Sequence, residues 1–501
     1  MAESILDDLF GQLFRRSPQH PALVSTSGLL SWSDFDTVAG RLSEILGAVV
    51  RAGQRVAVLA PNGPALLAGL LASWRLQAVA VPLNVRWRSY ELERVLHDAE
   101  PTAIVTVPSF QGYAFADLIS GLRPSIPTLQ RIILVDSSGA VLDEGTDDET
   151  SPAESLPPEV CALLYTSGTT GEPKGAMVTH RSQTDGARAF AEVLRINRED
   201  IALFVVPIAH AFGFTTCLSA LASGARVVLV ESAFSLGPVV DCAAAHRATI
   251  LHGAPAFFVG LQKLHAVEGL RSLRTGFVAG APSPAPLLRA LDEAGLQILN
   301  LYGMTEIGGA CCCRPEDPPL ARHTTVGRPL PGYGLRTHPQ PQGEVQVSGP
   351  CVTPGYYRRP KETAAAFDNG WFRTGDLGSF DADGNLCISG RAKDVIQVAG
   401  LNVFPAEVEG LLLTHPDVVQ AAVIGWPHPV TGETVRAFVV ARPGSDLTPR
   451  DLLQFARLRI AGYKLPYVIQ MLHELPVLST GKPDRATLVR MVKEDNHAVG
   501  R

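Results

Sequence analysis

The sequence predicts an α/β fold, with a large N-terminal domain made of two layered α/β subdomains and a small β-barrel, followed by a small α+β C-terminal domain. Chain length, the alternation of strand-like and helix-like segments, and a charged break near residue 390 lead to this prediction. At 501 residues the chain exceeds what one hydrophobic core usually supports, and 46% hydrophobic with 18% charged residues is typical of soluble globular proteins.

Apolar strand-like runs alternate with helix-length segments over most of the chain, which favours a layered α/β architecture. The first part of the alternation predicts strands at 56–60, 78–82 and 103–107 and helices at 37–51 and 65–74. The next part predicts a helix at 185–194 and strands at 202–206, 226–230 and 249–251. The acidic stretch 137–158 between them is expected to be a surface connection.

A region dense in Pro and Gly, 329–357, contains short strands such as 344–348, which favours a small antiparallel barrel. Further on, the strand-like segment 386–389 gives way to a charged run at 390–394. We therefore predict an N-terminal domain over 1–390 and a C-terminal domain over 391–501, a size within the usual range for domains. The second domain is expected to contain a helix at 405–413, strands at 418–425 and 435–441, and a helix at 450–460.

Composition excludes several classes of partner and compartment. The net charge of −6 and the scattered Lys and Arg residues give no basis for nucleic-acid binding. The acidic N-terminus and the broken apolar stretch 56–83 predict neither an export signal nor a membrane span. The eight cysteines form no disulfide framework, which favours a cytoplasmic location, and the run Cys311–Cys313 is expected to act as small buried hydrophobes.

The segment Tyr165–Gly175 is the strongest indication of function in the sequence. It holds five hydroxyls, three glycines and one lysine, a composition that suits a polyphosphate because backbone N–H groups, hydroxyls and an ammonium can all meet anionic oxygens. ATP is the expected ligand. The segment differs from the common P-loop, since Pro173 precedes Lys174, and the apolar runs on both sides favour a strand–loop–strand arrangement.

Six further motifs follow this segment in a fixed order. They are His210-Ala-Phe-Gly213, Ala279-Gly-Ala-Pro282, Tyr302-Gly-Met-Thr-Glu306, Gly370-Trp-Phe-Arg-Thr-Gly-Asp376, Gly390-Arg391 through Glu409, and Ser479-Thr-Gly-Lys482. With them the chain resembles the adenylate-forming superfamily, and within it the acyl- and aryl-CoA synthetases, over nearly its whole length. The resemblance implies an enzyme that uses ATP to activate a carboxylate as an acyl-adenylate, after which a second nucleophile displaces AMP.

The resemblance implies a role for each motif residue in ATP binding. Thr305 would donate to the α-phosphate, and Glu306 would be the carboxylate that holds Mg²⁺. Asp376 would accept hydrogen bonds from the ribose hydroxyls, with Arg391 reaching the ribose or the phosphates. Other implied contacts are the phosphate-binding residues Thr166, Ser167, Gly168, Thr169, Thr170 and Lys174, the adenine-stacking Tyr302, and the purine-lining backbone of Gly280, Ala281 and Pro282.

The resemblance also implies that the C-terminal domain is mobile. Lys482 would bridge the substrate carboxylate and the α-phosphate during adenylation. Lys393 would be the hinge about which the domain then swings, removing Lys482 and bringing in the loop 396–405, which contains Gly400. In CoA ligases that loop lines the tunnel for the pantetheine arm, so one domain serves two half-reactions.

The substrate is expected to be a bulky apolar monocarboxylic acid, either aryl, alicyclic or medium-chain. The pocket segments contain no arginine that could pair with a second carboxylate, and Gly308 and Gly309 would leave room for a large group. His210 is a further catalytic candidate, which would gate the CoA tunnel or cap the pocket. The expected pocket residues are His210, Phe212, Gly213, Phe214, Ala254, Gly280, Gly303, Met304, Gly308 and Gly309.

The final acceptor stays open between several alternatives, of which the CoA thiol leads. An amino-acid substrate is disfavoured because Ala211 stands where relatives that activate amino acids carry an aspartate. Transfer to a carrier-protein phosphopantetheine and a luciferase-like oxygenation share the same motifs, and a homodimer is a further open prediction. A catalytically inactive nucleotide-binding relative is the alternative of another class, and Lys482, which a pure binder does not need, argues against it.

Overall fold

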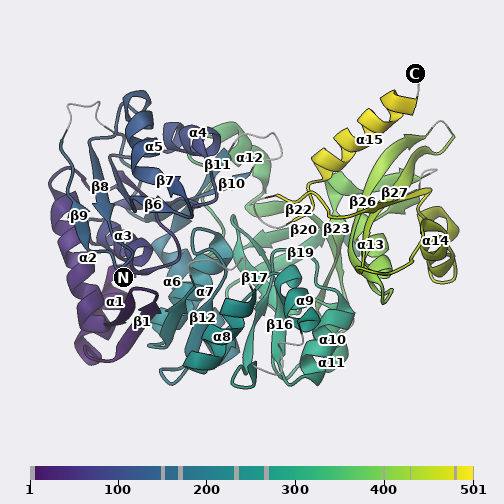
Figure 1. Ribbon diagram of the computed structural model, residues 1–501, viewed down its shortest axis with the longest axis horizontal. Coiled ribbons are helices and arrows are strands. Elements are labelled where there is room, and N and C mark those ends of the chain that lie inside the picture. The colour runs from purple at the N-terminus through teal and green to yellow at the C-terminus, as the bar shows by residue number, and fades with distance from the viewer. Residues whose placement is uncertain are drawn as a thin grey trace.

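Two large sheets form the body of the molecule in the computed structural model, which describes residues 6–147, 153–167, 173–230, 236–264, 270–398, 401–428, 430–478 and 482–499 (Figure 1). The first sheet has the order β11 (Pro173–Thr179), β10 (Val160–Ser167), β4 (Val79–Pro82), β3 (Arg55–Leu59), β5 (Ala103–Thr106), β8 (Arg131–Val135) and β9 (Val141–Asp143). Its inner strands are parallel and buried on both faces, as expected for a layered α/β fold.

The second sheet also has a parallel centre. Its order is β18 (Arg328–Pro329), β17 (Gly308–Cys312), β16 (Gln297–Met304), β15 (Thr275–Val278), β14 (Ile250–Leu251), β12 (Ile201–Phe204), β13 (Arg226–Leu229), β1 (Pro21–Ser25) and β2 (Gly28–Ser31). The strands from β12 to β16 run parallel, so their carboxyl ends share one edge of the sheet. Ligands of open parallel sheets bind at that edge, and the functional motifs collect there.

Helices cover and separate the two sheets. They are α1 (Leu6–Arg16), α2 (Trp32–Gly47), α3 (Pro64–Arg75), α4 (Ser89–Ala99), α5 (Phe115–Leu122), α6 (His180–Leu194), α7 (Ala211–Ala222), α8 (Leu236–His246), α9 (Pro255–Lys263), α10 (Ala285–Glu293), α11 (Pro319–Thr324) and α12 (Pro360–Ala366). The largest apolar cluster joins side chains of both sheets with those of α3 and α7. The predicted alternation is therefore confirmed.

Local sequence explains where the helices begin. Ser31 caps α2, because its hydroxyl accepts from the N–H of Asp34 while the Asp34 carboxylate accepts from the N–H of Ser31. This cap starts the helix at Trp32, five residues before the predicted start at Thr37. Thr179 and Ser182 form the same arrangement at the start of α6.

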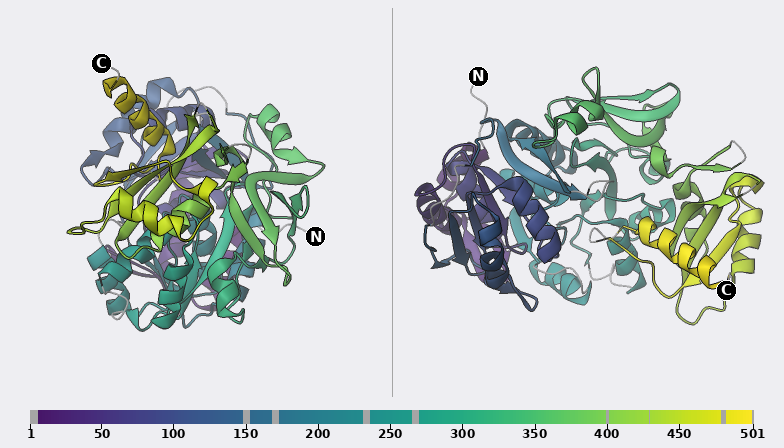
Figure 2. Two further views of the ribbon diagram at one scale, coloured as in Figure 1. Left: turned by 90° about the vertical axis from the view of Figure 1, so that its right-hand side faces the viewer. Right: turned by 90° about the horizontal axis from the view of Figure 1, so that it is seen from above.

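The remaining strands form an antiparallel sheet and a separate C-terminal sheet. The first contains β19 (Gly334–His338), β20 (Gln342–Ser348), β21 (Phe367–Asp368), β22 (Trp371–Phe380) and β23 (Leu386–Arg391), and a short hairpin of β6 (Ser109–Phe110) and β7 (Tyr113–Ala114) lies elsewhere. The C-terminal part contains β24 (Ile396–Val398), β25 (Leu401–Val403), β26 (Val418–His428), β27 (Gly432–Ala441) and β28 (Val468–Leu472) with α13 (Pro405–Leu413), α14 (Pro449–Arg457) and α15 (Arg485–Val499). It forms one end of the molecule, beside the antiparallel sheet (Figure 2). The domain boundary between residues 390 and 391 and the movement of the C-terminal domain stay predictions.

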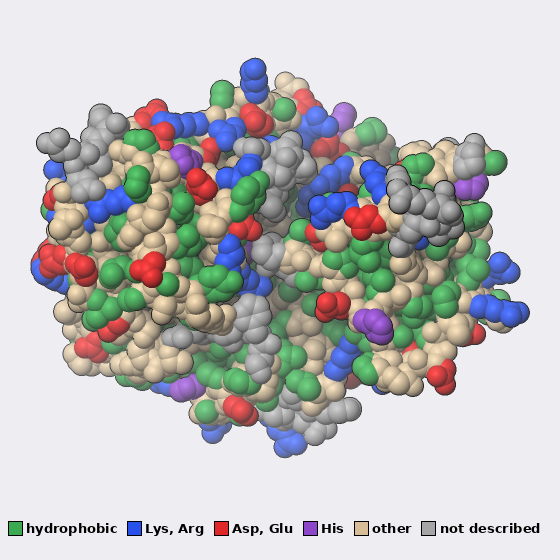
Figure 3. All heavy atoms as spheres, turned by 45° about the horizontal axis from the view of Figure 1, so that its top comes forward, with side chains coloured by type: hydrophobic (Ala, Val, Ile, Leu, Met, Phe, Trp, Pro, Cys, Tyr) green, Lys and Arg blue, Asp and Glu red, His purple; other side chains and the backbone are tan. Residues whose placement is uncertain are grey.

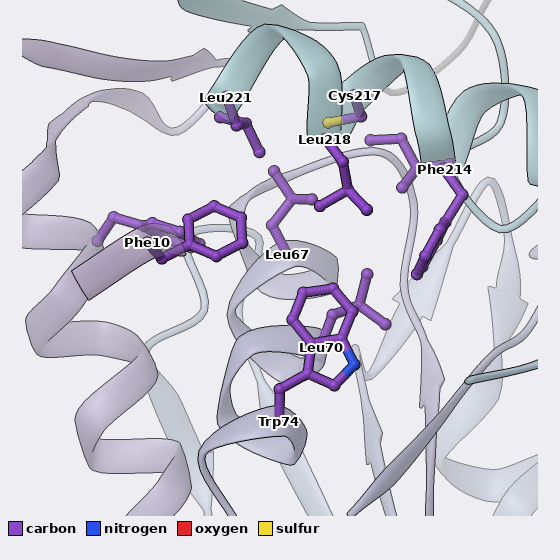
Figure 4. Close-up of a pocket in the computed structure, with 10 residues that line it drawn as sticks. Phe10, Leu67, Leu70, Trp74, Phe214, Cys217, Leu218 and Leu221 are labelled. Atoms are coloured by element: carbon purple, nitrogen blue, oxygen red, sulfur yellow. The ribbon is translucent and has the colours of Figure 1, made fainter. Parts of the chain in front are cut away.

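Phe214 lies in the core and not in the acid pocket, where it was expected. It is 1% exposed, and its ring meets Trp74 of α3 edge-on, with 6.0 Å between the ring centroids. With Phe10, Leu70 and Leu218 it lines a small apolar cavity between the helices (Figure 4). Residues two apart on a helix point about 200° apart, so Phe212 and Phe214 cannot both face the site.

Replacement of Phe214 by Ala should lower the free energy of unfolding by about 3–5 kcal/mol, because it removes a fully buried ring from the core. The preference among acids should not change. Urea unfolding and a panel of acids in an adenylation assay check both statements. Phe212→Ala on the same helix is the matched control, which should change the preference among acids more than stability. A changed acid preference in Phe214→Ala would contradict the placement.

Candidate active site

The two strands predicted on either side of the segment that is expected to bind phosphate are present as β10 and β11. β10 and β11 pair antiparallel, with Thr166 opposite Lys174. The Lys174 ammonium lies 5.6 Å from the centroid of the Tyr356 ring. Residues 168–172 and the side chain of Ser167 lie outside the described part of the chain, so the contacts expected of Ser167, Gly168, Thr169 and Thr170 stay predictions.

One of the five hydroxyls in this segment, that of Tyr165, binds a carboxylate of the protein itself. Tyr165 is buried, and its phenol donates to Asp98 Oδ2 at 2.7 Å. Arg359 pairs with the other oxygen of the same carboxylate at 2.6 Å. Tyr165 therefore anchors the hairpin to α4 and does not bind phosphate.

Thr305 and Glu306 lie in the tight turn between β16 and β17. The turn requires glycine at position 303, because a Cβ there would lie 2.0 Å from the carbonyl oxygen of Gly308. Gly308 itself adopts a φ of +62°, which favours glycine. The turn places the two side chains at the edge where the parallel strands of the second sheet end.

Glu306 is a buried carboxylate held by several neighbours. It is 6% exposed, and burial raises the pKa of its carboxyl. A hydrogen bond from the Tyr356 hydroxyl, 2.8 Å from Oε1, opposes this shift, and so do the positive charges of Arg391 and Lys174. The turn thus holds the carboxylate close to the cations that are expected to bind phosphate.

Tyr356 is a site residue that the sequence analysis missed. It connects the phosphate hairpin, through its ring at Lys174, with the carboxylate of Glu306. Backbone bonds fix it there, since Tyr357 N–H donates to Gly175 at 2.8 Å and Met177 N–H donates to Gly355 at 3.0 Å. In the sequence this tyrosine falls at the end of the barrel region, and only its pairing with β11 shows its role.

The donor set at Glu306 fits a magnesium ion that is bound together with a polyphosphate. Mg²⁺ usually takes one or two protein carboxylates and fills its remaining positions with phosphate oxygens and water. The described residues contain no group of three or more His, Cys, Asp or Glu side chains that could enclose a metal alone. Glu306 is a single carboxylate, held by the Tyr356 hydroxyl at Oε1, which agrees with this mode.

Asp376 and Arg391 face each other across the strands β22 and β23. They are direct register partners, and Arg391 Nε lies 2.8 Å from Asp376 Oδ1. Tyr302 at the end of β16 donates to the other oxygen, Oδ2, at 2.8 Å. Burial raises the pKa of Asp376, while Arg391, Tyr302 and Lys482 lower it. The three residues predicted to hold adenine and ribose are therefore brought together.

Lys482 reaches this group from the C-terminal part. The residue is exposed as a whole, but protein atoms surround its ammonium closely enough to lower its pKa by desolvation. Arg391 lowers the pKa of Lys482 further, while Asp376 opposes the shift. Figure 3 shows a furrow between the body and the C-terminal part, with Lys and Arg side chains on both sides. The charge of a lysine in one part therefore acts on the charged group of the other.

His210 lies where the second sheet meets the first. Its Nε2 is 3.2 Å from Asn84 Nδ2, and its pKa is lowered to about 4 by burial, Arg86 and Lys482. The imidazole is therefore neutral at pH 7. A cavity of about 80 Å³ adjoins it, with a lining that includes Asn62, Asn84, Arg86, Arg88, Phe110 and Ala209.

The structure gives a specific reason for glycine at three of the positions that were predicted to line the acid pocket. A Cβ on Gly309 would lie 2.3 Å from the ring of Phe190. The Phe190 ring therefore occupies the space beside Gly309, and this glycine does not enlarge the pocket. A Cβ on Gly213 would lie 2.2 Å from Pro207 O, which ties the start of α7 to the preceding turn. Gly280 follows β15 with a φ of +89° and exposes backbone at the edge, as a purine-lining segment requires.

Other expectations have separate outcomes. Cys311, Cys312 and Cys313 are fully buried, which confirms their packing role. Lys393 lies in a short 3₁₀ turn, Ala392–Asp394, between the last strand of the antiparallel sheet and β24, and Gly400 lies outside the described residues. Within the described ranges, no helix is both long and apolar enough to cross a bilayer.

Comparison with known proteins decides the family. Residues 10–357 match the AMP-binding enzyme family, and residues 407–482 match the AMP-binding enzyme C-terminal domain. The chain belongs to the AMP-binding enzyme family. This membership confirms the predicted resemblance to the adenylate-forming superfamily.

Individual relatives of this AMP-binding enzyme match it over nearly its whole length. A feruloyl-CoA synthase of Amycolatopsis sp is 35% identical over 480 residues, which cover 93% of this chain and 95% of that protein. A dioxo-octahydroindenyl propanoyl:CoA ligase of Mycobacterium tuberculosis is 33% identical and covers 95% and 97%. The crystal structure of ATP-bound MatB from Rhodopseudomonas palustris superposes with a TM-score of 0.86 at 29% identity, covering 97% of this chain and 99% of that one.

Replacement of Tyr356 by Phe should lower kcat/KM for ATP by about 10–100-fold and raise the Mg²⁺ concentration that gives half-maximal rate. The variant keeps the ring beside Lys174 but removes a hydrogen bond to a charged group, a loss of about 1.5–3 kcal/mol. Initial rates over a Mg²⁺ titration measure both effects.

Tyr357→Phe is the matched control, because the Tyr357 hydroxyl is buried without a hydrogen-bond partner among the described residues. Its kinetics should stay close to those of the parent protein. Equal effects of the two substitutions would show that Tyr356 acts by packing alone.

Proposed function

We propose that the protein is an ATP-dependent carboxylic acid:CoA ligase that forms an acyl-AMP intermediate and then an acyl-CoA thioester on a bulky apolar monocarboxylic acid. The observation that carries this proposal is Lys482, a cation of the C-terminal part that interacts electrostatically with Asp376, Arg391 and His210 of the body. A protein that only bound the nucleotide would not need this additional cation from the C-terminal part.

In the first half-reaction a carboxylate oxygen of the acid attacks the α-phosphorus of ATP. The bond from that phosphorus to the bridging oxygen of pyrophosphate breaks, and pyrophosphate leaves with the electron pair. Negative charge grows around the α-phosphorus, so fixed cations and donors lower the barrier. In this proposal Lys482 meets the carboxylate and α-phosphate, Lys174 holds the leaving pyrophosphate, and Thr305 donates to the α-phosphate.

A magnesium ion at Glu306 would supply charge neutralisation for the phosphates. Tyr356 orients the Glu306 carboxylate for that purpose. Asp376 and Tyr302 fix the ribose and the adenine, which keeps the α-phosphate in line with the incoming acid.

In the second half-reaction the thiol of CoA loses its proton, its sulfur attacks the acyl carbon, and AMP leaves with the electron pair of the cleaved C–O bond. The cavity beside His210 supports entry of the CoA from this side, because its half-buried Arg86 and neighbouring Arg88 suit a phosphate-bearing substrate. In this proposal His210, neutral at pH 7, would stand between that cavity and the acid pocket and gate the thiol.

The predicted pocket residues and the names of the relatives both support a bulky apolar acid as the substrate. Phe212, Ala254 and Met304 offer apolar contacts. The relatives at 35% and 33% identity are named for feruloyl and dioxo-octahydroindenyl propanoyl groups, both of which contain rings. We therefore favour aryl and alicyclic acids over medium-chain acids.

ATP–pyrophosphate exchange with a panel of aryl, alicyclic and medium-chain acids tests the first half-reaction, and acyl-CoA formation with the same panel tests the second. Exchange with no acid would favour the inactive nucleotide-binding alternative. Exchange without thioester formation from CoA would favour a carrier-protein acceptor, which an assay with a phosphopantetheinylated carrier protein would then detect.

Replacement of Lys482 by Ala should lower the adenylation rate by about two to three orders of magnitude, as for the loss of one donor at a developing charge. Thioester formation from supplied acyl-AMP and CoA should largely survive, because Lys482 acts only in the first half-reaction. Single-turnover assays of each half measure this split. Equal losses in both halves would contradict the proposed alternation.

Replacement of Lys393 by Pro should slow thioester formation at least tenfold and leave adenylation within about threefold, because proline fixes the φ angle of the proposed hinge. Lys393→Ala is the matched control, since it removes the same side chain and keeps backbone freedom. Rapid-quench measurement of the acyl-AMP intermediate checks the result. Normal CoA transfer in Lys393→Pro would place the hinge elsewhere.

A further inference from the structure

An aromatic layer lies beneath the acid pocket at the carboxyl edge of the second sheet. Phe190 of α6 packs under Gly309, and its ring centroid is 5.0 Å from that of Phe277 on β15. Phe277 stacks on His252 at 5.7 Å, and His252 meets Phe212 at 6.1 Å with the rings at 76°. His252 is therefore the centre of this layer, and Phe212 is its half-buried ring, on the side that is expected to face the acid.

The hydrogen bonding of His252 fixes its tautomer. The backbone N–H of Phe277 donates to His252 Nδ1 at 3.1 Å. A backbone amide can only donate, so Nδ1 carries the lone pair and Nε2 carries the proton. Complete burial lowers the pKa of His252 to about 3, which agrees with a neutral ring.

The Nε2–H donor has no hydrogen-bond partner among the described residues. His252 is fully buried, and the rings of Phe204, Phe212 and Phe277 surround it. Most buried polar groups in native proteins are satisfied. A water is a poor partner here, because a buried water needs two to four polar contacts and this layer offers aromatic rings.

We infer that His252 determines acid specificity by donating a hydrogen bond from Nε2 to a neutral oxygen at the end of the acid remote from the activated carboxylate. This inference rests on the proposed ligase function and deepens it. The substrate class is then an aryl or alicyclic acid with a ketone, ether or phenol oxygen that reaches the layer past the edge of Phe212. A second carboxylate is excluded, since a neutral imidazole among aromatic rings leaves the anion without a countercharge.

The test uses pairs of acids that match in shape and differ in one acceptor atom. Suitable pairs are para-methoxy- with para-ethyl-phenylpropenoic acid, and 4-oxocyclohexyl- with 4-methylidenecyclohexyl-propanoic acid. ATP–pyrophosphate exchange gives kcat/KM for each acid. The parent protein should prefer the oxygen-bearing member by about tenfold, the effect of one neutral hydrogen bond in a buried site.

His252→Met removes the donor and should bring this ratio close to one, mainly through a higher KM for the oxygen-bearing acid. His252→Gln keeps an N–H donor and should retain part of the preference. Phe204→Leu is the matched control, because it alters a ring that packs on His252 but no polar atom, so it should leave the ratio unchanged.

Each outcome bears on a different statement. Exchange with none of the acids would overturn the ligase function itself. Exchange with equal kcat/KM within every pair, or an unchanged ratio in His252→Met, would overturn the role of His252 and leave the ligase function standing. If His252→Met does not fold, the ratio in the parent protein and in His252→Gln still decides.

Discussion

The structure of the site depends on the burial of two carboxylates among cations at the meeting point of the sheets. Glu306 and Asp376 are both largely buried, and burial raises the pKa of each. Charge inside a protein is tolerated only when it is paired and hydrogen-bonded. Arg391 lowers the pKa of both groups, so one guanidinium on β23 supports the carboxylates of two different sheets.

The sequence predicts the layers well because hydrophobic periodicity and buried parallel strands leave a local signal. The helix 405–413 has the predicted bounds, and strands flank the segment expected to bind phosphate, as the apolar runs on its two sides predicted. Helix starts are less predictable, since the cap Ser31–Asp34 and the buried Trp32 and Phe35 begin α2 five residues before the predicted start. The motif residues Tyr302, Asp376 and Arg391 come together as expected, because strand register places Asp376 opposite Arg391 and the Tyr302 hydroxyl reaches the same carboxylate from β16.

The predictions from sequence were wrong where the direction of a side chain determines whether it reaches the site. Phe212 and Phe214 were both expected in the acid pocket, yet on α7 Phe214 packs in the core against Trp74 while Phe212 stays half-buried beside His252. Gly309 suggests open space, but Phe190 occupies it from a helix more than a hundred residues earlier in the chain. Tyr356 and His252 belong to no motif recognised in the sequence, and the motif residue Tyr165 was expected among the phosphate-binding hydroxyls. The positions of all three follow from long-range hydrogen bonds with Glu306, the backbone of Phe277 and Asp98.

The charges around Lys482 give a reason why the proposed movement of the C-terminal part would come after adenylation. Among the described residues of the site, the cations Lys174, Arg391 and Lys482 face the two carboxylates, and Arg391 repels Lys482 enough to contribute to its lowered pKa. At the proposed site ATP would add several negative charges, so its binding would favour a position of the C-terminal part that keeps Lys482 near the carboxylates. Once pyrophosphate leaves, much of that negative charge is gone while the repulsion from Arg391 persists. Release of the leaving group would therefore weaken the hold on Lys482 and couple the first half-reaction to the departure of the domain that carries it.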